Sequence, residues 1–266
     1  MIKLPDERSV VSNYNPKLLV LFGKPKCGKS TIMASIDSNL IIDLEDGYRS
    51  LSVMAVQARS ANDLFEIKDA IIEKGKELKR KPYKYITIDN ATRLEEMALS
   101  YATKLYRDTP MGAMYGYKTD DKGKPITDSN GNYIDLHKDI RTLPQGGGYL
   151  YLRLAIKQLI NMFKPLCDTL ILVAHVKDKQ IRKDSEEMSE MTVDLAGKLG
   201  DIICGEADAI GYIYREGKKT FMSFEGGDNT IKEARPIHLR GRKFCVAESD
   251  ADNNIKVDLS QIFIED

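Results

Sequence analysis

Short apolar runs alternate along the chain with segments in which apolar residues recur at helical spacing. The runs at 17–22, 40–44 and 169–174 are almost entirely apolar and predict strands that are buried on both faces. A further run at 83–88 is rich in β-branched and aromatic residues and predicts another strand, and 53–58 predicts a short one.

Four segments between these runs predict helices, of which the first covers 29–36. Asn62 is expected to cap the second helix and Pro82 to end it, while the fourth helix follows the glycines at 146–148. The apolar faces of the last three helices are Leu64, Ile67, Ile71 and Leu78; Leu94, Met97, Tyr101 and Leu105; and Leu152, Ile156, Leu159, Ile160 and Phe163.

Buried strands that alternate with helices predict an α/β fold, a mainly parallel central sheet with right-handed crossovers. In such sheets ligands bind beyond the carboxyl ends of the strands. Glu45, Asp89 and His175 each follow or end one of the predicted strands. We therefore expect these three side chains to converge.

The remaining segments change in character. The stretch 108–148 is rich in turn signals and is interpreted as an insertion that projects from the core, with an Asn130–Gly131 hairpin turn. A charged, irregular stretch is expected at 177–193, and strands are expected at 209–215, 220–224 and 237–246. Residues 1–266 are thus interpreted as a single domain that carries the insertion at 108–148 and a β-rich C-terminal part at 205–266.

Composition excludes several classes of function. Lys plus Arg and Asp plus Glu both number 40, and this balance provides no global attraction to nucleic acid or anionic lipid. No apolar run approaches the length of a membrane span, and the first residues are too polar for a signal peptide. The four cysteines are far apart in sequence, which is typical of free thiols in a reducing cytoplasm.

The loop between the first predicted strand and helix carries the most specific motif. Gly23 to Ser30 matches GxxxxGK[ST], in which backbone N–H groups surround phosphate oxygens and the following helix presents its positive end. Lys29 is expected to reach the β- and γ-phosphates, Ser30 to bind Mg²⁺ and Thr31 to support the α-phosphate. The alternative is a chance match in a turn. The predicted nucleotide-binding residues are Gly23, Lys24, Pro25, Lys26, Cys27, Gly28, Lys29, Ser30 and Thr31.

Asp89 has the form of a Walker B aspartate, because it directly follows the strand predicted at 83–88. It is expected to hold Mg²⁺ together with Ser30. The alternative is that Asp89 only caps the helix that starts near Ala91. The next residue is Asn90 and not a glutamate, so a general base for hydrolysis must come from elsewhere in the chain.

The order of these parts over 17–176 resembles the AAA_24 group of RecA-like phage and bacterial nucleotide-binding proteins, which includes the Sak4-type single-strand annealing ATPases. The motifs that carry the resemblance are Gly23 to Thr31, Ile42-Asp43-Leu44-Glu45-Asp46-Gly47, Ile86-Thr87-Ile88-Asp89 and Val173-Ala174-His175. The resemblance implies that Glu45 activates the attacking water and that His175 senses the γ-phosphate. The alternatives are an ordinary acidic turn and an ordinary core or surface histidine.

The resemblance also implies partners. RecA-like proteins contact single-stranded DNA through two loops, which correspond here to 108–148 and 177–195; ordinary solvated loops are the alternative. The first loop combines cations with aromatic rings, a composition that suits single strands: Lys118, Lys122, Lys124, Tyr115, Tyr117 and Tyr133. A homo-oligomer is implied, with Arg240, Arg242 or Lys243 reaching the neighbouring subunit's γ-phosphate, or else lying on a polar surface.

Together these features predict a Mg²⁺-dependent ATPase that acts on single-stranded DNA in phage-type recombination or annealing, with recombination or replication proteins as further partners. ATP is expected rather than GTP from the resemblance, and the guanine-reading NKxD motif is absent. The protein is expected in the cytoplasm, that of a bacterial host if a phage encodes it. Two alternatives remain open: a P-loop small-molecule kinase, and a non-catalytic ATP-gated assembly protein.

Overall fold

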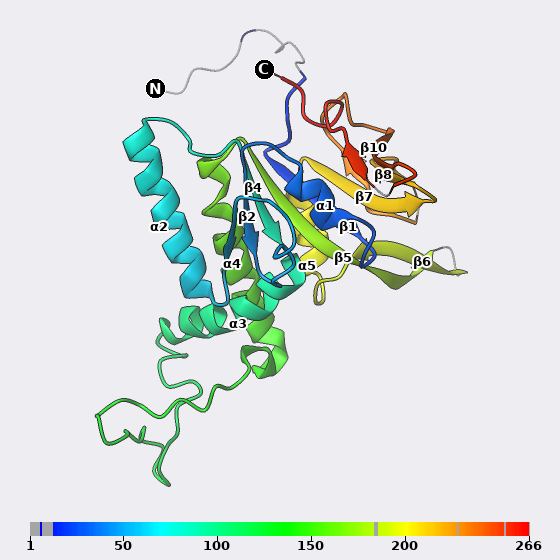
Figure 1. The fold of residues 1–266 in the computed structure, drawn as a ribbon. Coiled ribbons are helices and arrows are strands. Elements are labelled where there is room, and N and C mark those ends of the chain that lie inside the picture. The colour runs from blue at the N-terminus through cyan, green and yellow to red at the C-terminus, as the bar shows by residue number, and fades with distance from the viewer. Residues whose placement is uncertain (1–5, 7–12, 184–185, 228, 253, 266) are drawn as a thin grey trace.

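The computed structural model describes residues 6, 13–183, 186–227, 229–252 and 254–265. Its centre is a mixed sheet with the strand order β11-β10-β8-β7-β1-β5-β4-β2-β3, to which β6 adds beside β5 and β9 beside β7 (Figure 1). The strands are β1 Leu18–Gly23, β2 Asn39–Asp43, β3 Ala55–Gln57, β4 Tyr85–Asp89, β5 Thr169–Lys183, β6 Glu186–Val193, β7 Ala209–Glu216, β8 Lys219–Ser223, β9 Glu233–Ala234, β10 Lys243–Ser249 and β11 Ile255–Val257. The helices are α1 Lys29–Ala34, α2 Ala61–Leu78, α3 Ala91–Arg107, α4 Gly147–Asn161 and α5 Leu199–Glu206, with short 3₁₀ turns at Ile140–Thr142, Pro144–Gly146 and Lys164–Leu166.

Five strands of the core, β3, β2, β4, β5 and β1, are parallel, and β7 continues the parallel set on the far side of β1. The strands β8, β10 and β11 extend the same sheet in antiparallel fashion. The predicted α/β class with a mainly parallel central sheet is therefore confirmed. Among the residues described, no helix combines the length and the apolar character that crossing a membrane requires.

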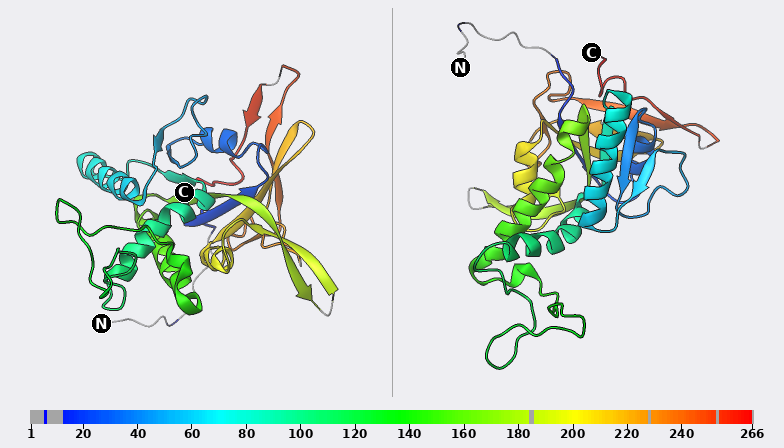
Figure 2. Two further views of the ribbon diagram at one scale, coloured as in Figure 1. Left: turned by 90° about the horizontal axis from the view of Figure 1, so that it is seen from below. Right: turned by 90° about the vertical axis from the view of Figure 1, so that its left-hand side faces the viewer.

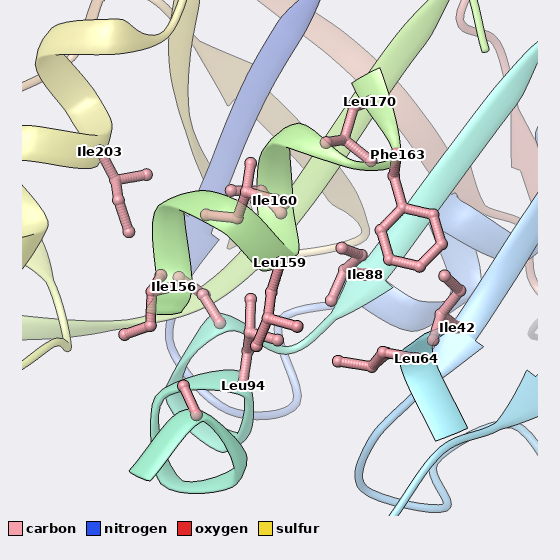
Figure 3. Close-up of a cluster of buried hydrophobic side chains, with 14 of the residues drawn as sticks. Ile42, Leu64, Ile88, Leu94, Ile156, Leu159, Ile160, Phe163, Leu170 and Ile203 are labelled. Atoms are coloured by element: carbon pink, nitrogen blue, oxygen red, sulfur yellow. The ribbon is translucent and has the colours of Figure 1, made fainter. Parts of the chain in front are cut away.

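Helices cover both faces of the sheet, which explains why its central strands are continuously apolar. The alternating side chains of β1 enter two separate clusters: Val20 and Phe22 pack toward α2, α3 and α4, whereas Leu19 and Leu21 pack with α1 and the C-terminal strands. Figure 2 shows α1 and α2 to α5 on opposite sides of the sheet. The larger cluster is drawn in Figure 3, where Leu159 of α4 and Phe163, two residues after that helix, lie against the strands.

The second helix differs from its prediction at both ends. Its cap is Ser60 and not Asn62: the Ser60 Oγ accepts the Asp63 N–H, and the Asp63 carboxylate accepts the Ser60 N–H at 3.1 Å. Leu78 was expected in the core but is 43 % exposed. An 18-residue helix is about 27 Å long, whereas a five-residue strand spans about 17 Å, so the last turns of α2 extend beyond the sheet.

The stretch expected to be irregular at 177–193 is instead a β-hairpin. The strand β5 does not end at His175; it continues to Lys183 and pairs with β6 from Val176↔Val193 to Lys183↔Glu186. The hairpin projects from the body of the molecule (Figure 1). Val193 at its base is buried with residues of α5, whereas Lys179 and Glu190 further along are half-buried. The continuous apolar run that marks the central strands is therefore missing here.

The predicted strand at 237–246 begins later than expected. Residues 236–242 form a turn in which the Pro236 carbonyl accepts the N–H groups of Leu239 and Arg240, and Gly241 has a φ of 64°. Only from Lys243 does the chain join β8 as β10. Of the apolar residues in this turn Leu239 is buried and Ile237 is 48 % exposed, so the apolar residues near 237 mark a turn and not a strand.

The segment 108–148 leaves the body of the molecule between α3 and α4 and forms the extended excursion at the bottom of Figure 1. Its predicted hairpin is confirmed: Thr127 pairs with Tyr133, and the Ile134 N–H donates to the Ile126 carbonyl at 3.1 Å. The Arg107 guanidinium donates to both oxygens of Asp135 and holds the pKa of that carboxyl at about 2. This bidentate pair attaches the excursion to α3.

Gly148→Ala is expected to destabilise the protein by about 1 to 3 kcal/mol, because overpacking a filled site costs this much. A Cβ at Gly148 would lie 1.7 Å from the Ile140 carbonyl oxygen, where α4 crosses the returning chain. The neighbouring Gly147→Ala is a matched control, since its nearest heavy atom is 4.0 Å away. It should be neutral or slightly stabilising in the helix. Urea midpoints of the two variants test this, and equal midpoints would contradict it.

Candidate nucleotide site

The carboxyl ends of β1, β2 and β4 lie beside the glycine-rich loop, next to the middle of β5 at His175. The register pairs Gly23 with His175, Asp43 with Asp89 and Asp89 with Val173, so these ends lie in one line across the sheet. They border a cavity of about 320 Å³. Its lining residues are Pro25, Lys26, Gly28, Lys29, Ser30, Thr31, Asp43, Glu45, Gly47, Tyr48, Asp89, His175 and Arg215. Lys29, Ser30, Glu45, Asp89 and His175 are thus brought together at one place.

The loop between β1 and α1 is tight, and two glycines make it possible. A Cβ at Gly23 would lie 2.4 Å from the Ile213 carbonyl oxygen of β7, and Gly28 has a φ of 100°, which side chains rarely adopt. Lys29 is only 7 % exposed, and its ammonium donates to the carbonyls of Gly23 and Lys24 at 3.0 and 2.9 Å. The loop therefore curves around a buried positive charge, which is the arrangement that binds phosphate.

Two other residues of the loop, Lys24 and Cys27, contribute less to the phosphate site. The Lys24 side chain is exposed, and Lys24 meets Lys29 only through its carbonyl. Cys27 is buried behind the loop, and burial raises the pKa of its thiol above the ordinary value. This thiol is consequently a small packing group at neutral pH.

Asp89 lies deep in the cavity, 7 % exposed. Burial raises the pKa of its carboxyl, against the hydrogen bond from Tyr48, which lowers it. The Ser30 hydroxyl donates to the same carboxylate oxygen at 3.5 Å. Hard oxygen donors next to a phosphate loop suit Mg²⁺, which in such sites takes one or two protein ligands and fills its shell with phosphate and water. Ser30 and Asp89 fit that ion.

Glu45 faces the same cavity from the turn after β2. The Asp43 Oδ1 accepts the N–H groups of Glu45, Asp46 and Gly47 at 3.0, 2.8 and 3.2 Å, and so fixes the turn. The Glu45 Oε1 lies 3.8 Å from the His175 Nε2. The acidic turn is thus built to hold one carboxylate at the mouth of the cavity.

Asn90 organises both α3 and His175. Its Oδ1 accepts the Arg93 N–H at 2.9 Å, so Asn90, and not Asp89, caps the helix. This bond fixes the amide, whose Nδ2 therefore donates to the His175 Nε2 at 3.1 Å. A neutral His175 then carries its proton on Nδ1, a buried atom without a hydrogen-bond partner in the described part of the chain.

Four residues of this site were missed by the sequence analysis: Asp43, Tyr48, Asn90 and Arg215. Arg215 is the last residue but one of β7. Its Nη2 lies 3.7 Å from the position that a Cβ on Gly28 would occupy. It has no ion pair with any carboxylate that the structure describes. The pairing of β7 with β1 places Arg215 beside the loop, and no local sequence pattern predicts that pairing.

The three basic residues expected to act across a subunit contact lie outside this cavity. The Arg240 guanidinium donates to the carbonyls of Ala234 and Arg235 within its own turn. The Lys243 ammonium lies 4.9 Å from the centre of the Phe221 ring, and Arg242 precedes it at the start of β10. Arg215 is therefore the arginine that this chain itself brings to the loop.

The sequence matches the AAA_24 family, described as an AAA domain, over residues 15–235. This range contains the loop, both acidic strand ends, His175 and Arg215. No curated protein matches the chain significantly. The match covers well over half of the chain and agrees with the geometry of the cavity. The chain therefore belongs to the AAA_24 family and has a P-loop ATPase-like, nucleotide-binding core.

Proposed function

We propose that the protein binds ATP with Mg²⁺ on the loop 23–31 and hydrolyses it. The observation that carries this proposal is the convergence, at one cavity, of a phosphate loop with a buried lysine, a Ser30–Asp89 pair and a carboxylate at Glu45. A phosphate-binding site alone does not need a carboxylate at its mouth, because that charge repels phosphate. A general base does need that position.

Each residue then has a definite role. Lys29 binds the β- and γ-phosphate oxygens, and Ser30 and Asp89 hold the metal ion, which neutralises charge on these oxygens when it is bound. Glu45 orients the attacking water and accepts its proton. His175, which lies 3.8 Å from Glu45 and is held by Asn90, contacts the γ-phosphate side and reports its presence.

Charge on the transferring phosphoryl group calls for an additional cation. Arg215 is positioned to supply it within one chain, as its guanidinium approaches the loop at Gly28. A homo-oligomer in which Arg240, Arg242 or Lys243 reaches a neighbour's phosphates is the second possibility. These two arrangements differ in whether turnover per chain depends on protein concentration.

We also propose that single-stranded DNA and ATP act on the protein together. The hairpin β5–β6 begins directly at His175, so one continuous strand connects the γ-phosphate side with a projecting element. The excursion at 108–148 exposes Lys118, Lys122 and Lys124, cations that suit a phosphate backbone. Recombination or annealing would follow from such coupling. Residues 1–266 would act as one domain, because β7 to β11 continue the core sheet.

Steady-state ATP hydrolysis with Mg²⁺, with and without single-stranded DNA and over a range of protein concentrations, tests these proposals. We expect turnover that DNA stimulates. Turnover indifferent to DNA would reject the DNA role, and nucleotide binding without turnover would favour an ATP-gated assembly protein. Turnover per chain that is constant with concentration supports Arg215 acting within one chain, whereas a rise supports a contact between subunits.

A small-molecule kinase is the second candidate, because of one specific observation. A cavity of about 630 Å³ adjoins the nucleotide cavity and shares Glu45 with it, and Arg59 and Arg93 lie on its walls. Such arginines suit an anionic phosphoryl acceptor. In the assay above supplemented with anionic small-molecule acceptors, a kinase would form ADP without an equal amount of inorganic phosphate, since it transfers the phosphoryl group to the acceptor. Release of one phosphate for each ADP in the presence of these acceptors would reject this candidate.

A further inference from the structure

Tyr48 is the residue of the nucleotide cavity with the closest contact to Asp89. Its phenol donates a hydrogen bond of 2.6 Å to the Asp89 Oδ2. Ser30 donates to this same oxygen at 3.5 Å. One carboxylate oxygen therefore receives donors from two elements, the phosphate-loop helix and the turn after β2.

The position of Tyr48 is itself well fixed. Its side chain is 4 % exposed and belongs to the buried cluster that includes Ile32 and Ile41. The turn that precedes it is held by the three N–H bonds to Asp43. A donor anchored in this way orients its acceptor, because the phenol cannot follow a rotation of the carboxylate.

The hydrogen bond from Tyr48 is the shorter of the two that the Asp89 Oδ2 accepts from the described residues, 2.6 Å against 3.5 Å for the one from Ser30. Without it the Asp89 side chain would keep, among these residues, only the longer contact with Ser30. The rotation of a carboxylate that binds a metal ion would then be poorly defined.

We propose that Tyr48 is a positioning residue, which holds the Asp89 carboxylate in the orientation that binds Mg²⁺. This inference rests on the proposed Mg–ATP site and adds to it a residue outside the phosphate loop and the Walker B strand. Groups that orient metal ligands typically change metal affinity 10- to 100-fold when they are removed. A purely structural role would give Tyr48 an influence on folding but none on the metal.

The test is Tyr48→Phe, which removes only the hydroxyl, with the binding of ADP measured through the rise in Tm that it causes. The Mg²⁺ concentration that produces half of the metal-dependent rise is expected to increase about 10-fold or more in Tyr48→Phe. The binding of ADP in EDTA, which depends on the loop and Lys29, should stay unchanged. Tyr101→Phe is the matched control, since its phenol bonds to Gln158 on α4 away from the cavity.

Three outcomes would separate the possibilities. A half-saturating Mg²⁺ concentration equal to that of the native protein and Tyr101→Phe would overturn the inference, even if Tyr48→Phe melts earlier. An equal loss of ADP binding with and without Mg²⁺ would also overturn it, because the hydroxyl would then support the whole site. A native protein that binds no nucleotide at all would instead reject the proposed function.

Discussion

Glu45→Gln is expected to bind ATP at least as tightly as the native protein and to hydrolyse it about 10²- to 10⁴-fold more slowly, the usual contribution of a general base. The amide is nearly isosteric with the carboxylate but cannot accept the proton of the attacking water. It also removes a negative charge from the mouth of a cavity that binds phosphate. Single-turnover hydrolysis and equilibrium binding of ATP, both with Mg²⁺, measure the two effects separately.

Asp46→Asn provides the control for this prediction. Asp46 is the next residue of the same turn, but its carboxylate pairs with Arg49 and does not line the nucleotide cavity. Its turnover should stay close to that of the native protein. If Asp46→Asn were as slow as Glu45→Gln, the acidic turn would matter only as a whole. If Glu45→Gln kept full activity, the base would have to be another group.

Lys29→Ala is expected to lose most nucleotide binding, with an affinity for ATP lower by about a hundredfold, because hydrogen bonds to charged groups are worth about 1.5 to 3 kcal/mol each. The Lys29 ammonium is the buried cation of the loop and already bonds to two loop carbonyls. Without it the loop keeps its backbone N–H groups but loses its buried cation. Thermal shifts with ATP and ADP report the loss.

Lys24→Ala is the matched control for Lys29→Ala. It removes a lysine from the same loop, yet the Lys24 side chain is exposed and its carbonyl remains. Its affinity should change little. A comparable loss in both variants would mean that the net charge of the loop, and not the position of Lys29, determines binding.

The fold class and the place of the site could be predicted from the sequence because their signals are local. The strands β1, β2 and β4 and the first part of β5, residues 169–174, are buried on both faces, so each is a short apolar run. The glycine-rich loop encodes its own conformation, since Gly28 adopts a φ that few other residues tolerate. Parallel strands end at the same edge, and this rule alone brings Glu45, Asp89 and His175 together.

Local pattern was misleading where the environment, and not the segment, decides the structure. The hairpin of β5 and β6 has no continuous apolar run because it is buried only at its base, beside α5, and its strands are held by pairing with each other. Asn62 is a good capping residue, yet Ser60 caps α2 because Asp63 completes the reciprocal pair of hydrogen bonds. The residue type alone does not show whether Ser60 or Asn62 has the hydrogen-bond partner that completes the cap.

The sequence by itself therefore determined the buried core strands, the phosphate loop and the edge of the sheet on which the site lies, since each depends on contiguous residues. Only the tertiary structure decided which other side chains enter that site. Tyr48 donates a hydrogen bond to Asp89, which is 41 positions further along the chain, and the pairing of β7 with β1 brings Arg215 close to Gly28. Such contacts depend on strand order and register, which are fixed only when separate elements pack together. The spacing of residues along the chain therefore does not predict them.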